Sequence, residues 1–240
     1  MIGVDSRLNS SEKYTMKNFK TIIFCALAVS LLIYGCSEEA PAPVEVKAEP
    51  EKKYEGTIVA VGDSLTEGLG VEEDFAYPAM LEKKLGDMGY PYQVINAGNS
   101  GETSSGTLAR IKWILTLKPD IVILVIGAND GFRGINPELI KTNIRKIVQE
   151  LKNQRVIVVL GAMQIVQNLG KDYTTAFASI YPEIALSENI ILTPFFLKGV
   201  AADPKLNQTD GIHPTAEGYR IIVDNIIPSV VEAIKIHRQK

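Results

Sequence analysis

Short apolar runs that alternate with stretches of helical periodicity constrain the fold of this chain more than any other feature. From Gly56 onward the runs are rich in β-branched residues and nearly continuous, which favours strands of a parallel sheet covered on both faces. Five such strands in about 185 residues predict one α/β domain, a three-layer sandwich with a five-stranded parallel sheet. The functional site is expected at the carboxyl ends of the strands. The predicted strands are Thr57–Val61, Tyr92–Ile95, Asp120–Ile126, Arg155–Leu160 and Asn189–Leu192.

Between the strands the sequence predicts helices. Asn136 followed by Pro137 favours a helix start, because asparagine caps a helix and proline suits its first position. Apolar residues then recur at helical spacing from Ile140 to Leu151. The sequence shows neither an internal repeat nor a second domain. The other predicted helices are Ala79–Leu85, Thr107–Leu117, Thr175–Leu186 with Pro182 inside, and Ala216–Ile236 with Pro228 inside.

An apolar segment near the N-terminus accounts for a slight apolar excess in an otherwise ordinary composition. The chain is 46% hydrophobic with a mean hydropathy of +0.08, and the excess is concentrated in Thr21–Tyr34. A membrane-spanning helix needs ~20 apolar residues, so this run is short for a permanent anchor and suits the core of a signal peptide. Because Lys17 and Lys20 precede it and small residues follow it, residues 1–35 are predicted to be a signal peptide. Met16 is interpreted as the true start.

The residues after this segment predict a lipid anchor and a tether. Residues 33–36 (Ile-Tyr-Gly-Cys) resemble a bacterial lipobox, the motif whose cysteine is lipidated and becomes the first mature residue. Plain secretion and an uncleaved anchor are the alternative interpretations. Cys25 lies within the predicted signal peptide, so cleavage leaves Cys36 alone and no intramolecular disulfide can form. Residues 36–55 are rich in Glu, Pro and Ala and are predicted to be a disordered tether, which leaves residues 56–240 as the domain.

The charge balance argues against nucleic acid as a partner. The chain has 25 basic and 28 acidic residues and a formal charge of −3, without the basic excess of a nucleic-acid-binding protein. Residues 1–35 contain four basic and two acidic residues, so the mature chain has 21 against 26 and a formal charge of −5. Such a surface gains nothing from anionic headgroups. The predicted membrane attachment therefore depends on the lipid at Cys36.

A serine follows the first predicted strand directly, in the sequence Gly-Asp-Ser-Leu-Thr at residues 62–66. A serine at a strand-to-helix turn is exposed at the edge of the sheet, with its N–H near a helix N-terminus. The loop lacks the Gly-x-Ser-x-Gly elbow of α/β-hydrolases, and it lacks the glycine patterns of nucleotide sites. Two interpretations remain open for it: Ser64 is a nucleophile, or Ser64 or Asp63 is simply a helix cap.

A histidine near the C-terminus offers a base for this serine. The chain has two histidines, and His237 is the fourth residue from the C-terminus, in His-Arg-Gln-Lys. His213 lies in Asp-Gly-Ile-His-Pro at residues 210–214, before the last predicted helix. A serine nucleophile needs an adjacent base, and the base needs a carboxylate that fixes its tautomer, for which Asp210 is suitably placed. The alternative is a capping aspartate beside a surface histidine.

Acyl transfer also requires donors that face a developing oxyanion. The loop after the second strand (residues 96–103) contains Gly98 and Gly101, and the loop after the third strand (residues 127–131) contains Asn129. The Ser64 N–H, one glycine N–H and the Asn129 amide would supply three donors at one edge of the sheet. Each loop alone is also explained as turn chemistry, since asparagine and glycine favour turns.

The four loops together resemble, in order, the four sequence blocks of the SGNH/GDSL hydrolase family, over essentially the whole chain from Thr57 onward. Within that family the chain is most similar to the periplasmic multifunctional thioesterase/lysophospholipase/arylesterase group. The resemblance implies a flavodoxin-like architecture with Ser64 as nucleophile, His213 as base and Asp210 orienting it. It also implies an oxyanion hole from Ser64, Gly101 and Asn129, in which Gly98 is interpreted as conformational. One departure is Ala128, where many relatives have glycine.

The implied function is a serine esterase that hydrolyses aryl esters, lysophospholipids and acyl thioesters through an acyl-enzyme, without a metal or organic cofactor. Export through the signal peptide predicts the bacterial periplasm or cell envelope, where cytosolic acyl-CoA is absent, so lysophospholipids or other esters are the expected natural substrates. A carbohydrate O-acetyl esterase and a non-catalytic, lipid-anchored binding module are the alternatives. The sequence does not indicate the oligomeric state. Candidate contacts for an acyl chain, with core packing as the alternative, are Met163, Ile165, Val166, Leu169, Phe195 and Phe196.

Overall fold

A parallel sheet forms the centre of the domain. The computed structural model describes residues 53–240, apart from the side chain of Gln167. The strand order is β2-β1-β3-β4-β5 with every pair parallel, which is the flavodoxin-like order and confirms the predicted fold class. The predicted signal peptide, Cys36 and the tether up to residue 52 lie outside the described residues. The strands are β1 (Gly56–Gly62), β2 (Tyr92–Gly98), β3 (Ile121–Val125), β4 (Ile157–Ala162) and β5 (Ile191–Phe195).

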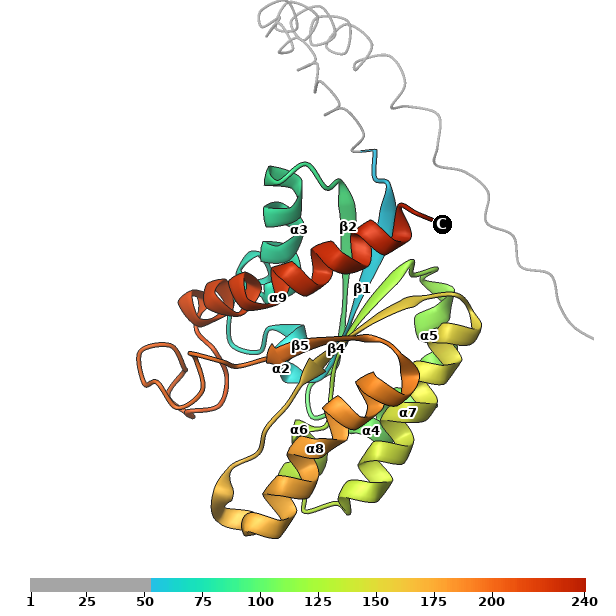
Figure 1. The fold of residues 1–240 in the computed structure, drawn as a ribbon. Helices are drawn as coiled ribbons and strands as arrows, with labels where there is room; N and C mark the ends of the chain where they lie inside the picture. Colours follow the sequence, from blue (N-terminus) through green and yellow to red (C-terminus); the bar gives the residue numbers. More distant parts are fainter. Residues whose placement is uncertain (1–52) are drawn as a thin grey trace, which may run out of the picture. The chain divides into compact units, whose positions relative to one another are not determined.

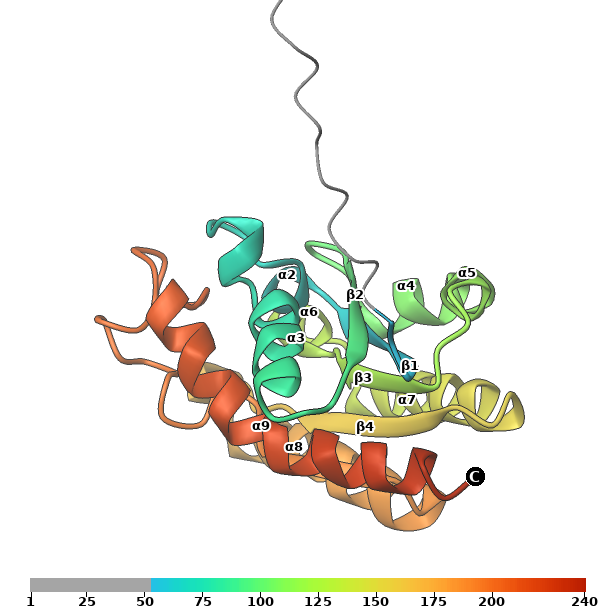
Figure 2. The same ribbon diagram turned by 90° about the horizontal axis from the view of Figure 1, so that it is seen from above.

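Helices cover both faces of the sheet and complete the three layers (Figure 1). On one face α9 contacts β3, β4, β5 and α3, and on the other face α7 and α8 contact β4, with α4 and α5 beside α7 (Figure 2). The helices are α3 (Tyr77–Asp87), α4 (Ser104–Ala109), α5 (Ile111–Thr116), α7 (Pro137–Asn153), α8 (Lys171–Glu188) and α9 (Ala216–His237). Shorter elements are α2 (Ser64–Glu67), α6 (Ala128–Phe132) and the 3-10 turns Glu73–Phe75 and Gln167–Leu169.

The core lies between the sheet and these helices. Every residue of β3 is buried, because β1 and β4 flank it and helices cover both of its faces. Helix α7 begins as predicted, with the Asn136 side chain accepting a hydrogen bond from the Glu138 N–H and with Pro137 at the first position. Each large apolar side chain that such a helix buries contributes roughly 1.5–3 kcal/mol. The buried apolar stripe of α7 is Ile140, Ile144, Ile147, Val148 and Leu151.

Two strands, β2 and β5, end three residues later than the sequence predicts. Residues 96–98 pair with residues 60–62 of β1, so β2 continues past Ile95 and the following loop begins only at Asn99. The extension was not predicted because backbone pairing does not depend on the polarity of the side chains. β5 likewise continues through Pro194 to Phe195. Proline is tolerated there because β5 is an edge strand, which leaves one side of the backbone unpaired.

The single helix predicted over Thr107–Leu117 is wrong, because the chain breaks it at Arg110. α4 ends at Ala109 and α5 begins at Ile111, with Arg110 at φ −100° and ψ 10° between them. The guanidinium group of Arg110 donates to the buried carboxylate of Glu102 and, at 2.7 Å, to the carbonyl oxygen of Ala97. A tertiary ion pair therefore accompanies the turn between the two helices.

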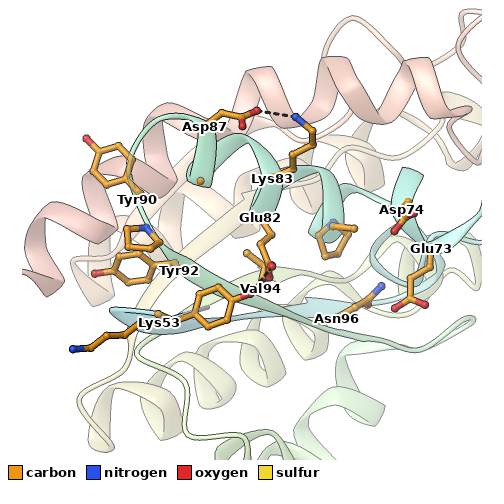
Figure 3. A pocket seen from close by; sticks show the side chains of 15 residues that line it. Lys53, Glu73, Asp74, Glu82, Lys83, Asp87, Tyr90, Tyr92, Val94 and Asn96 are labelled. Carbon is orange, nitrogen blue, oxygen red and sulfur yellow. Dashed lines mark hydrogen bonds and ion pairs between the residues drawn. The ribbon is translucent and has the colours of Figure 1, made fainter. Parts of the chain in front are cut away.

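Two side chains accept hydrogen bonds from outward-facing N–H groups of β2, the strand at one edge of the sheet. The Glu82 carboxylate accepts hydrogen bonds from the Val94 N–H at 2.8 Å and from the Tyr54 hydroxyl at 2.9 Å. The Gly98 N–H donates to the side chain of Asn96 at 2.9 Å. Such contacts hinder pairing with a further strand. A cavity of about 600 Å³ lies against this edge, lined mainly by residues of α3 and β2 (Figure 3).

The last residues of the predicted tether bond to the folded unit. The Glu55 N–H donates to the Pro91 carbonyl at 2.7 Å, and the Glu55 carboxylate accepts from Arg238, beyond the end of α9. Residues 54 and 55 therefore pack with the domain that was predicted to begin at Gly56. No helix within residues 53–240 is long and apolar enough to cross a membrane.

Candidate active site

Ser64 is the first residue of α2, and only Asp63 separates it from the end of β1. Asp63 caps this helix, since its side chain accepts a hydrogen bond from the Leu65 N–H at 3.0 Å. The helix-cap interpretation of the loop therefore applies to Asp63. The Ser64 N–H has no acceptor within the helix, because the first amides of a helix have none, and the Ser64 hydroxyl points to another segment of the chain.

That segment is the loop that contains His213 and Asp210. His213 Nε2 lies 2.9 Å from Ser64 Oγ, across 149 positions of sequence, and His213 Nδ1 lies 2.6 Å from Asp210 Oδ2. When Nδ1 carries the proton and donates to Asp210, Nε2 accepts from the Ser64 hydroxyl. A serine, its base and an orienting carboxylate are thus linked in the order that nucleophilic catalysis requires.

Asp210 is held as a carboxylate by donors on both of its oxygens. Oδ1 accepts from the N–H groups of Ile212 and His213, at 2.8 Å and 3.0 Å, and Oδ2 faces the imidazole. The hydrogen bond from the His213 side chain, followed by these two backbone N–H groups, lowers the pKa of Asp210 to about 2. The group is therefore ionised at neutral pH.

Backbone and side-chain contacts fix the loop that carries His213 against α2. The Gln208 N–H donates to the His213 carbonyl at 2.7 Å, and the Thr215 N–H donates to the Leu206 carbonyl at 2.9 Å, which closes the loop on itself. The Gln208 side chain donates to the Leu69 carbonyl at 2.7 Å, just beyond the end of α2. The loop with the histidine and the turn with the serine are thus also held together by contacts other than that of His213 with Ser64.

The two remaining donors predicted from the sequence come from the segments after β2 and β3. Asn129 lies in α6, and its amide donates to Asp63 Oδ2 at 3.2 Å, which leaves a second N–H on the same nitrogen. Gly101 has φ +75°, a conformation that favours glycine. The Gly98 N–H already donates to Asn96, and a Cβ at Gly98 would lie 2.1 Å from the Glu67 nitrogen. Gly98 thus allows a close approach of β2 to α2.

Asp63 has a contact that sequence reasoning missed. Its carboxylate is 1% exposed and bridges the Leu65 N–H at the start of α2 and the amide of Asn129. Burial raises the pKa of Asp63 to about 6, although both hydrogen bonds and the nearby His213 act in the opposite direction. An aspartate directly after a strand whose last five residues are buried was the available signal, but its partner lies 66 positions further along the chain.

We expect Asp63→Asn to remove a pH dependence from the stability of the domain. A native pKa of about 6 against an ordinary value of 3.8 means that wild-type stability is full below pH 4 and falls as the pH rises through 6. The free energy of unfolding of the variant, relative to the wild type, is therefore expected to rise by up to about 3 kcal/mol between pH 4 and pH 7. Denaturant unfolding at a series of pH values measures it.

The same variant is expected to lose the ester hydrolysis that the sequence resemblance implies, because an amide at position 63 presents N–H groups to the Asn129 amide and favours its rotation. Asp74→Asn, at an exposed carboxylate, is the matched control and is expected to change neither the pH dependence of stability nor the activity. A stability difference that stays constant from pH 4 to pH 7 would contradict the assigned burial effect.

The candidate acyl contacts divide into core residues and accessible ones. Met163 and Phe196 are buried, and Phe196 packs edge-on against Tyr77, so neither presents surface to a substrate. Ile165 is half-buried beside Gly131 of α6. The candidates that retain accessible surface are Ile165, Val166, Leu169 and Phe195.

Within residues 53–240, no cluster of three or more His, Cys, Asp or Glu side chains is arranged to hold a metal ion.

Comparison with known proteins agrees with the fold and with the order of the four loops. The profile of the GDSL-like Lipase/Acylhydrolase family matches residues 60–221. Esterase TesA of Pseudomonas aeruginosa is 37% identical over 202 residues, which cover 84% of this chain and 97% of that protein. Arylesterase of Vibrio mimicus is 34% identical over 73% of this chain and 88% of that protein. Thioesterase 1/protease 1/lysophospholipase L1 of Escherichia coli K12 is 35% identical over 70% of this chain and 80% of that protein.

Solved structures give the same result. The crystal structure of TesA superimposes with a TM-score of 0.71 at 36% identity, covering 74% of this chain and 99% of that one. The esterase EstA from Pseudoalteromonas sp., in a structure inhibited by monoethylphosphonate, superimposes with a TM-score of 0.71 at 29% identity. The match covers 75% of this chain and 99% of EstA. The chain belongs to the GDSL-like lipase/acylhydrolase family. Fold and family together define it as an SGNH/GDSL-type esterase.

Proposed function

We propose that Ser64 is the nucleophile of this esterase, that His213 is its general base and that Asp210 orients His213. The linked contacts of Ser64 Oγ with His213 Nε2 at 2.9 Å and of His213 Nδ1 with Asp210 Oδ2 at 2.6 Å carry this proposal. The ionised Asp210 favours the tautomer in which Nε2 is free to accept a proton, and it stabilises the imidazolium that forms.

Acylation begins when Ser64 Oγ attacks the carbonyl carbon of the ester and its proton passes to His213 Nε2. The carbonyl oxygen becomes negative and accepts hydrogen bonds from the N–H groups of Ser64 and Gly101 and from the free N–H of Asn129. The bond to the leaving group then breaks, and His213 returns the proton to the departing oxygen or sulfur. The product of this half-reaction is an acyl-serine.

Deacylation repeats these steps with water. His213 Nε2 removes a proton from a water molecule, whose oxygen attacks the acyl carbon, and the same three donors stabilise the oxyanion. The Ser64 oxygen leaves and recovers its proton from His213, and the carboxylic acid is released. Every proton is accounted for by the side chains of the site and water, so the mechanism uses no metal or organic cofactor.

The proposed substrates are small acyl esters and lipids: aryl esters, lysophospholipids and acyl thioesters. The names of the relatives support this range, since they include an arylesterase and a thioesterase/lysophospholipase. Apolar surface at Ile165, Val166, Leu169 and Phe195 is available for an acyl chain. An envelope location favours lysophospholipids and other esters over cytosolic acyl-CoA as natural substrates.

A substrate series tests this function on the purified protein. Aryl esters from acetate to palmitate, lysophosphatidylcholine, an acyl thioester and an acetylated polysaccharide are compared, and an organophosphonate is used to label the nucleophile. We expect hydrolysis of aryl esters beyond acetate and one covalent phosphonate adduct per chain. Deacetylation of the polysaccharide without turnover of medium-chain aryl esters would favour a carbohydrate esterase instead. A protein that neither hydrolyses nor is labelled would be the binding module.

We further propose that residues 1–35 are removed as a signal peptide, that residue 36 carries the lipid anchor and that the chain from there to residue 53 tethers the folded domain to a membrane of the bacterial envelope. The spacing of charged, apolar and small residues around Cys36 supports the proposal. Cells labelled with a fatty-acid analogue test it: incorporation is expected in the wild type and absent in Cys36→Ala. Unprocessed, unlabelled protein in the cytosol would overturn the proposal.

A further inference from the structure

We infer that Glu67 is a positioning residue for the oxyanion hole, and that with Arg133 it fixes the direction of the Gly101 N–H. This inference rests on the proposed function, because it concerns the donor that Gly101 supplies to the reacting carbonyl oxygen. Neither side chain reaches the serine or the histidine. Both contact the loop between β2 and α4, which contains Gly101.

Glu67 is the last residue of α2, the helix that Ser64 begins. One oxygen of its carboxylate accepts a hydrogen bond from the Ser100 N–H at 3.0 Å and a second from the Ser100 hydroxyl. The backbone carbonyl of Glu67 also accepts from the Asn96 side chain at 3.2 Å. The loop with the oxyanion donor is therefore held by the same short helix that presents the nucleophile.

Arg133 holds the loop from the opposite side. It follows the end of α6, the helix that contains Asn129, and its guanidinium group donates to the Gly101 carbonyl at 2.9 Å. The two anchors thus come from the two helices that carry the other proposed oxyanion donors. A shift of the loop relative to Ser64 or Asn129 would break one of these contacts.

The contacts determine where the Gly101 N–H points. Glu67 fixes the peptide group before Ser100 through its N–H, and Arg133 fixes the peptide group after Gly101 through its carbonyl. The peptide group between them carries the Gly101 N–H, so its orientation follows from its two fixed neighbours. Within residues 53–240 no acceptor bonds to this N–H, whereas the amides on either side, of Ser100 and Glu102, both have partners.

An open N–H on a loop with φ +75° at Gly101 needs external support to keep one direction, because glycine has a wide conformational range. Stabilisation of an oxyanion depends on donors that are already oriented before the charge develops. Loss of the Glu67 carboxylate is therefore expected to weaken transition-state binding while leaving ground-state binding of the ester unchanged. A defect in kcat without a change in KM is the signature of this role.

The experiment compares hydrolysis of one aryl ester with inhibition by a trifluoromethyl ketone of matched acyl length, which adds to the serine and forms an oxyanion. For Glu67→Ala we expect kcat to fall about 10-fold with KM unchanged, less than the loss from removing a donor outright. The inhibition constant of the ketone is expected to rise by the same factor. In Glu67→Gln the amide oxygen still accepts the Ser100 N–H. Its kcat is therefore expected to fall, and its inhibition constant for the ketone to rise, by only about 3-fold.

Glu72→Ala is the matched control, since Glu72 is an exposed acid five residues further along, outside the contacts described above. It is expected to leave kcat, KM and ketone inhibition unchanged. Arg133→Gln tests the opposite anchor and is expected to raise the inhibition constant in proportion to its loss of kcat. Thermal unfolding of each variant reports whether the domain remains folded.

The outcomes separate this inference from the function it rests on. A partly unfolded variant has less active enzyme, which lowers the apparent kcat but leaves the inhibition constant of the ketone unchanged. Glu67→Ala with wild-type ketone inhibition would therefore overturn the positioning role. A wild-type protein that neither hydrolyses the ester nor binds the ketone would instead overturn the assignment of the nucleophile.

Discussion

Ser64→Ala is expected to lower ester hydrolysis by at least about 10⁴-fold, because no acyl-enzyme can form without the hydroxyl oxygen. The three proposed oxyanion donors remain, so a residual rate above the uncatalysed reaction is expected. Phosphonate labelling is expected to disappear completely. Steady-state hydrolysis and the mass of the phosphonate-treated protein measure the two effects.

The fold is expected to survive this change. Ser64 Oγ makes one hydrogen bond, to the partly exposed side chain of His213, and a bond of this kind contributes about 1 kcal/mol to stability. Ser179→Ala is the matched control, because Ser179 is also half-buried and its hydroxyl donates to a carbonyl within α8. Ser179→Ala is expected to retain full activity. A phosphonate adduct on Ser64→Ala would show that another residue is the nucleophile.

Asp210→Asn is expected to lower kcat by about 10³- to 10⁴-fold while changing KM little. The asparagine oxygen can still accept the N–H groups of Ile212 and His213, so the loop is expected to keep its shape. The amide nitrogen, however, presents N–H groups to His213 Nδ1. The imidazole then carries its proton on Nε2, where it can no longer accept one from Ser64. Kinetics at saturating substrate measures this loss.

A second aspartate in the same region provides the control. Asp203 also accepts a backbone N–H two residues on, that of Lys205 at 2.9 Å, and it lies outside the contacts of His213. Asp203→Asn is expected to keep wild-type activity. Should Asp210→Asn retain more than a tenth of the wild-type kcat, Asp210 would not be the residue that orients the base.

The elements that burial determines were predictable from the sequence. The apolar runs identified all five strands, and Asn136 with Pro137 identified the start of α7. The turn at Arg110 was not predictable, because the ion pair with Glu102 that accompanies it forms only in the folded chain. The end of β2 was likewise not predictable, because residues 96–98 are polar or small and are recognised as strand only by their pairing with β1.

In the candidate site, too, some residues were predictable from the sequence and their supporting contacts were not. The meeting of Ser64 with His213 at the sheet edge was predictable, because a hydroxyl and an imidazole stand in a loop after a strand and in the loop before the last helix. Asn129 was predicted at the same edge because it follows the third strand. Their supporting contacts were not, because these depend on the register of neighbouring strands. Asp63 reaches Asn129 only when β1 and β3 are paired, and Glu67 reaches Ser100 only when β1 and β2 are. Met163 and Phe196 show the limit for apolar residues, whose burial no loop motif reveals.

The distance of 149 positions between Ser64 and His213 has a consequence for the biogenesis of the protein. The proposed nucleophile is among the first of the described residues to be synthesised, whereas the proposed base precedes only the last described helix, α9. A chain that crosses a membrane with its N-terminus first would therefore carry a serine without a base for almost the whole passage. Ester cleavage at the proposed site would begin only once the loop with His213 has folded against α2.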